Sequence, residues 1–139
     1  MRDAYSAAVS EFMSRAVISL KKDVEIRKAA EVLINRNISG VMVLDDNGAP
    51  IGVLSEMDIA AAVKEGRTDA KIEKFMSREV YAVSPKTTLR EAAEIMRERN
   101  VHRLFVYPGK EGIIPVSGEE VPLGIVTSKD IIRALAGSD

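Results

Sequence analysis

The sequence lacks cysteine altogether and has a single histidine, His102. Without cysteine there is no disulfide, no thiolate metal site and no cysteine nucleophile. One histidine excludes zinc sites built on several histidine or cysteine ligands, and it leaves no serine–histidine–aspartate triad that we can assemble. Glycine-rich phosphate loops of the G-x-x-x-x-G-K-[ST] and G-x-G-x-x-G types are also absent. We therefore expect a protein that is not an enzyme and binds no metal.

Excess charge and long apolar runs are missing as well. The 20 basic and 21 acidic residues leave a net charge of -1, so we do not expect nucleic acid as a partner. No apolar run approaches the roughly 20 residues that cross a bilayer, and the first residues lead into no apolar signal-peptide stretch. We expect a cytoplasmic protein without a membrane partner. Its 139 residues, 46% of them hydrophobic, are sufficient to build a folded core.

The sequence contains one internal repeat. Segments of the first half recur in the second half at a constant offset, with one shift of register before the last strand of each copy, and most mismatches exchange one aliphatic residue for another. Internal repetition of this kind indicates a duplicated structural unit. The matched segments include Phe12-Met13-Ser14-Arg15 with Phe75-Met76-Ser77-Arg78, Ala29-Ala30-Glu31 with Ala92-Ala93-Glu94, and Ile51-Gly52-Val53-Leu54-Ser55 with Leu123-Gly124-Ile125-Val126-Thr127.

Each copy has the same order of predicted elements. A short β-branched run, at residues 17–20 and 80–83, predicts a strand. An apolar stripe with i, i+3, i+4, i+7 spacing then predicts a helix, and Thr88 with Glu91 predicts a capping box at the start of the second of these helices. Two strands and a last helix follow, the helices starting near Ser55 and Thr127. The remaining predicted strands are residues 41–44, 51–54, 104–107 and 123–126.

We therefore expect an α+β fold of two tandem β-α-β-β-α repeats. A three-stranded sheet with two helices on one face leaves its other face bare, so we expect the repeats to pack with pseudo-twofold symmetry into one module. Between the last two strands of the second copy lies an insertion, which is either a mobile surface hairpin or a lid or partner contact. The expected segments are a lead-in helix at 1–12, repeat 1 at 13–65, a connector at 66–75, and repeat 2 at 76–137 with its insertion at 108–122.

The duplicated pattern resembles the cystathionine β-synthase (CBS) domain in the tandem pair called a Bateman module. The stretches that carry the resemblance are residues 38–48 and 52–59, with counterparts at 101–106 and 124–131. The resemblance implies a regulatory module that binds an adenosine compound (AMP, ADP, ATP or S-adenosylmethionine) in clefts between the repeats. It implies a change in repeat or dimer geometry on binding, a homodimer formed through helices, and control of a partner, such as a separate effector protein. The alternative is a ligand-free scaffold for protein association or dimerisation.

Two Ser/Thr-x-x-Asp motifs are the main candidate binding residues. Ser55 with Asp58, and Thr127 with Asp130, lie where a strand passes into a helix. One interpretation is helix capping, in which these side chains satisfy free N–H groups of the first turn. The other is ligand binding, since a helix N-terminus and a hydroxyl suit a phosphate and a carboxylate can accept both ribose hydroxyls. The resemblance implies the second role.

The other candidate residues would surround the base and the phosphate. His102 and Arg103 lie where the family places basic side chains against phosphate, and Lys129 is a further candidate. The first copy has Ser39 and Gly40 instead of this basic pair, so we expect unequal sites, with more phosphate charge bound beside His102-Arg103. Which strand pairs with which Ser/Thr-x-x-Asp motif stays open. The candidates for the base are Val17, Ser19, Ile38, Ser39 and Gly40 in the first copy and Val80, Ala82, Val101, His102 and Arg103 in the second; for the valines and Ile38 the alternative is a plain core position.

Overall fold

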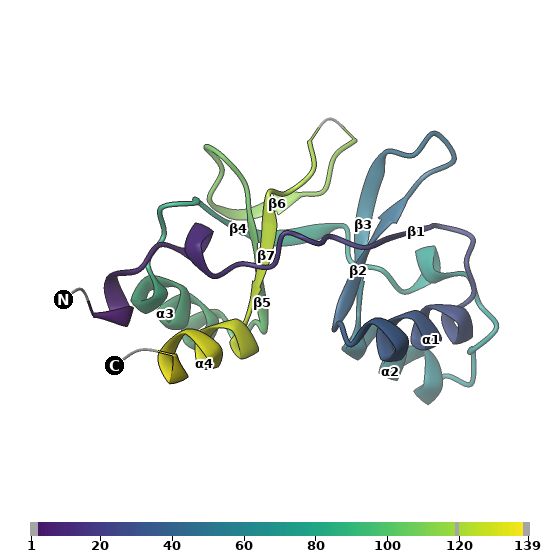
Figure 1. Ribbon diagram of the computed structural model, residues 1–139. Coiled ribbons are helices and arrows are strands. Elements are labelled where there is room, and N and C mark those ends of the chain that lie inside the picture. The colour runs from purple at the N-terminus through teal and green to yellow at the C-terminus, as the bar shows by residue number, and fades with distance from the viewer. Residues whose placement is uncertain (1–2, 119, 138–139) are drawn as a thin grey trace. The chain divides into compact units, whose positions relative to one another are not determined.

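The computed structural model describes residues 3–118 and 120–137, and the chain divides into two compact units (Figure 1). The N-terminal unit consists of Ile18–Val80 and Pro115–Val121. The C-terminal unit consists of the described parts of Met1–Val17, Tyr81–Ile114 and Pro122–Asp139. The predicted α+β class is confirmed, since each unit combines a small sheet with two α-helices. Residues 1, 2 and 119, which belong to the expected lead-in helix and insertion, lie outside the described residues.

The N-terminal unit contains a three-stranded sheet in the order β1-β2-β3. Strand β1 runs parallel to β2, and β2 runs antiparallel to β3. The turn between β2 and β3 depends on Asp45, whose carboxylate accepts the N–H groups of Asn47 and Ala49, and on Gly48 at φ 82°. The elements are β1 (Ser19–Lys21), α1 (Ile26–Arg36), β2 (Gly40–Leu44), β3 (Pro50–Ser55), α2 (Glu56–Lys64) and a 3-10 helix, η3 (Ile72–Lys74).

The C-terminal unit repeats this plan with one additional strand. Its sheet has the order β6-β4-β5-β7, with β4 parallel to β5 and β5 antiparallel to β7. The insertion supplies β6, which lies at the edge of the sheet beside β4. The elements are the 3-10 helices η1 (Ala4–Ser6) and η2 (Val9–Glu11), then β4 (Glu79–Val83), α3 (Leu89–Arg99), β5 (Arg103–Val106), β6 (Gly112–Pro115), β7 (Gly124–Thr127) and α4 (Ser128–Ala136).

The first helix of each unit begins and ends as its sequence dictates. At the start of α3, the Thr88 hydroxyl accepts the N–H of Glu91, and the Glu91 carboxylate accepts the N–H of Thr88, which confirms the predicted capping box. The hydrogen bonds from Thr88 hold the pKa of Glu91 below its ordinary value, so this contribution to stability is lost as the pH falls. Asn37 and Asn100 end α1 and α3 in the left-handed conformation, at φ 54° and 52°.

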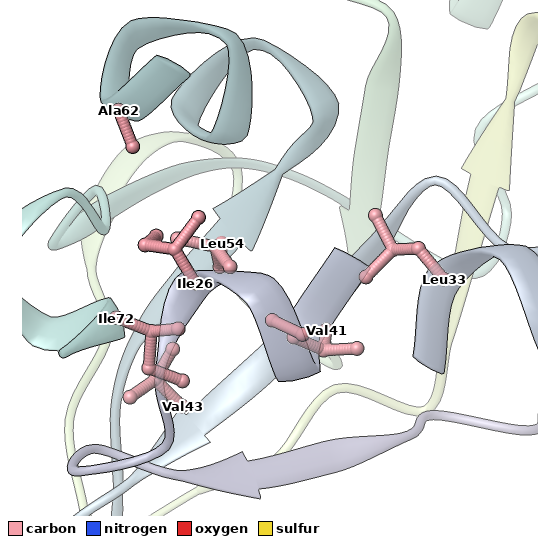
Figure 2. Packing of buried hydrophobic residues seen from close by; sticks show 8 residues of the cluster. Ile26, Leu33, Val41, Val43, Leu54, Ala62 and Ile72 are labelled. Atoms are coloured by element: carbon pink, nitrogen blue, oxygen red, sulfur yellow. The ribbon is translucent and has the colours of Figure 1, made fainter. Parts of the chain in front are cut away.

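The helices of the N-terminal unit pack on one face of its sheet (Figure 2). Ile26 and Leu33 of α1 and Ala62 of α2 cluster with the β2 and β3 side chains that point toward them. The predicted apolar stripe of α1 is therefore the face that it buries. Ile72 belongs to the same cluster although it lies in the expected connector between the repeats, and it is 0% exposed. The strand residues in the cluster are Val41, Val43 and Leu54.

The segment that opens each repeat in sequence packs on the sheet of the other repeat's unit. Ser77 pairs with Val53 of β3 through two backbone hydrogen bonds of 2.8 and 2.9 Å. In the same way, Ser14 pairs with Ile125 of β7 through two bonds of 2.9 Å. The 12–15 and 75–78 segments, which match in sequence, thus occupy matching places in opposite units.

The lead-in segment differs from the expected helix over residues 1–12. Its described part forms the two short 3-10 helices η1 and η2. The Val9 N–H donates to the carbonyl of Thr87 at 2.7 Å, and the Ser10 N–H donates to that of Pro85 at 3.2 Å. These N–H groups are engaged by the loop before α3, so a continuous α-helix cannot use them. Across residues 3–118 and 120–137, none of the helices combines the length and the apolar character that a bilayer crossing requires.

Glycine is required where the 75–78 segment lies against β3 and where the 12–15 segment lies against β7. A Cβ on Gly52 would lie 2.7 Å from the carbonyl oxygen of Ser77 and 2.7 Å from the sulfur of Met76. A Cβ on Gly124 would lie equally close to the carbonyl oxygen of Ser14 and the sulfur of Met13. The methionine side chains can move, whereas the backbone carbonyls are held in the bridges described above.

We predict that Gly52→Ala and Gly124→Ala each destabilise the protein by about 1–3 kcal/mol, because overpacking moves backbone. Urea denaturation followed by circular dichroism measures this loss. An unchanged midpoint in both variants would contradict the close approach.

A second prediction concerns the connector. Replacing Ile72 by alanine should cost about 2–5 kcal/mol, the usual range for an apolar side chain removed from a core. The matched control is Ile34→Ala, because Ile34 lies on α1 with 81% of its surface exposed. Equal denaturation midpoints for the two variants would show that the connector is not part of the core.

Candidate functional site

The strand directions bring the candidate residues of each copy to one edge of its sheet. Because β3 runs antiparallel to β2, Ser55 at the end of β3 pairs with Gly40 at the start of β2. The Glu56 N–H in the first turn of α2 donates to the Ser39 carbonyl at 3.2 Å. In the C-terminal unit, Thr127 pairs with Arg103 in the same register. We call these two edges the N-terminal and C-terminal half-sites.

In the N-terminal half-site, Asp58 caps the N-terminus of α2. One of its carboxylate oxygens, Oδ2, accepts the Ser55 N–H at 2.8 Å and the Ser55 hydroxyl at 3.0 Å. The other oxygen, Oδ1, makes no hydrogen bond within the part of the chain that the structure describes. Both residues are only half-buried. The motif thus has the geometry of a helix cap, and it still presents one carboxylate oxygen that can accept a hydroxyl group.

In the C-terminal half-site, the equivalent carboxylate is more fully engaged. Oδ2 of Asp130 accepts the Thr127 N–H at 2.8 Å and the Thr127 hydroxyl at 3.2 Å. Oδ1 faces the guanidinium of Arg133, with 3.4 Å between Oδ1 and Nη1. Asp130 is buried, one of two buried polar or charged residues in the described part of the chain. A buried carboxylate needs such partners, because burial without them is costly.

The two half-sites differ in charge. In the C-terminal half-site His102 and Lys129 are exposed and Arg103 is half-buried, and the Ser128 N–H of α4 donates to the His102 carbonyl at 3.4 Å. The N-terminal half-site has no basic side chain at the corresponding positions. These positions are Ser39, Gly40 and Met57 in place of His102, Arg103 and Lys129, and the first turn of α2 adds the exposed acidic Glu56.

The remaining candidates divide by burial. Val80 and Ala82 are buried, as core residues are, whereas Val17 and Ser19 retain exposed surface. Val17 groups with the C-terminal unit and Val80 with the N-terminal unit, so each lies in the unit opposite to its own sequence copy. The residues just before β2 and β5 are half-buried: Ile38, Ser39 and Val101.

Sequence inspection did not single out Arg133, although the signal was present. An arginine three residues after an aspartate on a helix lies on the same face and within reach of it. The first copy has Ala61 at that position. Among residues 3–118 and 120–137, no group of three histidine, aspartate or glutamate side chains is arranged to hold a metal ion. The chemistry that these edges support is binding through hydrogen bonds and charge.

Comparison with known proteins places both copies in one family. The model of the CBS domain matches residues 9–65 and again residues 72–137. A 33.4 kDa protein of Thermofilum pendens is 30% identical over 115 residues, which are 83% of this chain and 35% of that protein. Protein MJ1225 of Methanocaldococcus jannaschii is 29% identical over 137 residues, which are 98% of this chain and 45% of that protein. The chain thus spans less than half the length of either relative.

Solved structures show the same fold. The CBS domain pair of protein MJ0100, in complex with 5′-methylthioadenosine and S-adenosyl-L-methionine, superposes with a TM-score of 0.75 at 27% identity, over 94% of this chain and 97% of that one. The protein CBSX2, in complex with AMP, superposes with a TM-score of 0.69 at 25% identity, over 93% of this chain and 96% of that one.

Proposed function

Because the chain belongs to the CBS-domain family and carries two copies of the domain, we propose that it is a regulatory module that binds an adenosine compound. The observation that carries the proposal is the N-terminal half-site, where Asp58 presents an unengaged carboxylate oxygen beside the start of α2. Two structural neighbours, MJ0100 and CBSX2, hold adenosine compounds. The proposed ligand is AMP, ADP, ATP or S-adenosylmethionine.

In the proposed mode, Asp58 accepts the ribose hydroxyls through Oδ1. The nine-residue helix α2 directs the partial positive charge of its N-terminus toward a phosphate or another polar group at the ligand's 5′ position. The Ser55 hydroxyl, which donates to Asp58 without ligand, turns to the same group. Ile38, Ser39 and Gly40 at the start of β2, with Ser19, offer apolar surface and backbone groups to the base.

The C-terminal half-site is proposed to bind an adenosine compound in the same way, but with more positive charge around the phosphate. Thr127 and Asp130 correspond to Ser55 and Asp58, while His102, Arg103 and Lys129 add positive charge for phosphate. Arginine suits this role because its guanidinium can contact two phosphate oxygens at once. The residues proposed for the base here are Val101 and, through its backbone groups, Ala82.

Regulation requires that the ligand prefer one arrangement of the module. Binding then shifts the population toward that arrangement, by as much as the ligand's affinities for the two states differ. We propose that this shift changes repeat or dimer geometry and so controls a partner, such as an effector protein. The copies are proposed to regulate rather than to catalyse. The expected cytoplasmic location stays a prediction.

A homodimer formed through α2 and α4 is part of the proposal. Both helices carry exposed apolar side chains, among them Met57 and Val63 on α2 and Ile132 on α4. Exposed apolar side chains at a protein surface favour association. The same feature supports the second candidate function, a ligand-free scaffold for dimerisation, and ligand binding distinguishes the two.

We predict that AMP, ATP or S-adenosylmethionine raises the melting temperature of the protein, since a ligand at 100 times its Kd adds about 2.7 kcal/mol of stability. Asp58→Asn should weaken the binding measured by calorimetry about 10-fold or more, because a hydrogen bond to a charged acceptor is lost. The matched control is Asp46→Asn, in the exposed β2–β3 turn. Absence of a shift with every compound favours the scaffold, and unchanged affinity in Asp58→Asn contradicts the ribose assignment.

For the dimer, Ile132→Glu should raise the dimer dissociation constant about tenfold or more, as expected when an interface side chain worth at least ~1.4 kcal/mol is lost. Sedimentation velocity over a concentration series measures it. Ile34→Glu, which changes an even more exposed isoleucine on α1 (81% against 64% for Ile132), is the control. A monomeric wild-type protein, or equal effects of the two variants, would contradict an interface on α4.

A further inference from the structure

We propose that Arg133 is a specificity-determining residue, which makes the Thr127–Asp130 motif select adenosine compounds that carry phosphate over uncharged ones. The inference rests on the proposed function and concerns how the two copies differ. It starts from the carboxylate oxygens. Asp58 has its Oδ1 open, whereas Oδ1 of Asp130 lies 3.4 Å from Nη1 of Arg133.

The contact occupies the atom that a ribose would need. Oδ2 of Asp130 already accepts the N–H and the hydroxyl of Thr127, so Oδ1 is the oxygen available for a ligand. A ribose can use Oδ1 fully only if the guanidinium moves away. Arg133 is able to move, because its side chain is 65% exposed and its guanidinium can return to water, and ribose hydroxyls that replace it keep the buried Asp130 carboxylate hydrogen-bonded. The contact therefore adds a small free-energy cost to ribose binding, but it does not prevent a ribose from reaching Asp130.

The interaction that the displaced guanidinium then makes depends on whether the ligand carries a phosphate. It remains beside the start of α4, together with Lys129 and Arg103, and it carries a positive charge. A phosphate bound there gains attraction from this charge, which offsets the cost of displacement. An adenosine compound without phosphate meets the same cost and gains nothing in return. The displacement cost is common to both ligands, so Arg133 favours the phosphorylated ligand through this attraction alone.

The first copy provides the comparison within the same molecule. Asp58 and Asp130 occupy matching positions on α2 and α4, and three residues further along each helix stand Ala61 and Arg133. A methyl group cannot reach the carboxylate or carry charge. The Ser55–Asp58 motif is therefore open to uncharged adenosine compounds, and the difference between the motifs lies in one side chain that can be exchanged.

The test compares AMP with 5′-methylthioadenosine by isothermal titration calorimetry, in the Asp58→Asn background so that the Thr127–Asp130 motif is the intact one. Adding Arg133→Ala should lower the ratio of AMP affinity to 5′-methylthioadenosine affinity about two- to fivefold, the range of one exposed ion pair. Arg97→Ala, which removes the same charge from an exposed position on α3, should leave the ratio unchanged. Conversely, Ala61→Arg in an Asp130→Asn background should raise the ratio.

The outcomes separate the inference from the function on which it rests. If the wild-type protein binds neither compound, the proposed function fails and the role of Arg133 fails with it. If the wild type binds but Arg133→Ala leaves the ratio unchanged, or if Arg97→Ala lowers it equally, the inference alone is wrong. Loss of all binding in the Asp58→Asn background while the wild type binds would also overturn it, because the second motif would then take no ligand.

Discussion

In each copy, the antiparallel pairing of two strands, β2 with β3 and β5 with β7, determines which residues can form a binding site. The pairing of Gly40 with Ser55, and of Arg103 with Thr127, places the beginning of one strand beside the end of the other. A helix starts at that end in both copies. Backbone groups before the strand, a hydroxyl, a carboxylate and a helix N-terminus therefore lie together at one edge. A register shift of one residue would turn the strand side chains to the opposite face and separate this group.

Much of this arrangement is predictable from the sequence, because it depends on local patterns. The apolar stripes that begin at Ile26 and Leu89 correspond to α1 and α3, and the capping box of Thr88 forms as expected. The edge strand β6 was less accessible to prediction. The glycine and proline residues of its segment favour an irregular loop, and it becomes a strand only because β4 offers an unpaired edge. The long-range pairing of Ser14 with Ile125, and of Ser77 with Val53, likewise has no local signal in the sequence.

For the candidate site, sequence identifies the residue types but not which of their atoms are engaged. Ser55-x-x-Asp58 and Thr127-x-x-Asp130 are nearly identical as motifs, and both are helix caps in the structure. They differ in a single contact from Arg133, which lies outside the motif. Capping and ligand binding are therefore not exclusive here, since the cap uses one carboxylate oxygen and leaves the second to be regulated by its surroundings.

The crossing of the leading segments bears on what one copy of the repeat lacks. The last strand of each unit's sheet pairs with a segment that opens the other repeat in sequence, and a glycine, Gly52 or Gly124, stands at the close approach. The repeated stretch of sequence therefore does not coincide with the unit that folds. A chain that held one copy alone would lack the segment that pairs with the last strand of its own sheet, unless a second chain supplied that segment.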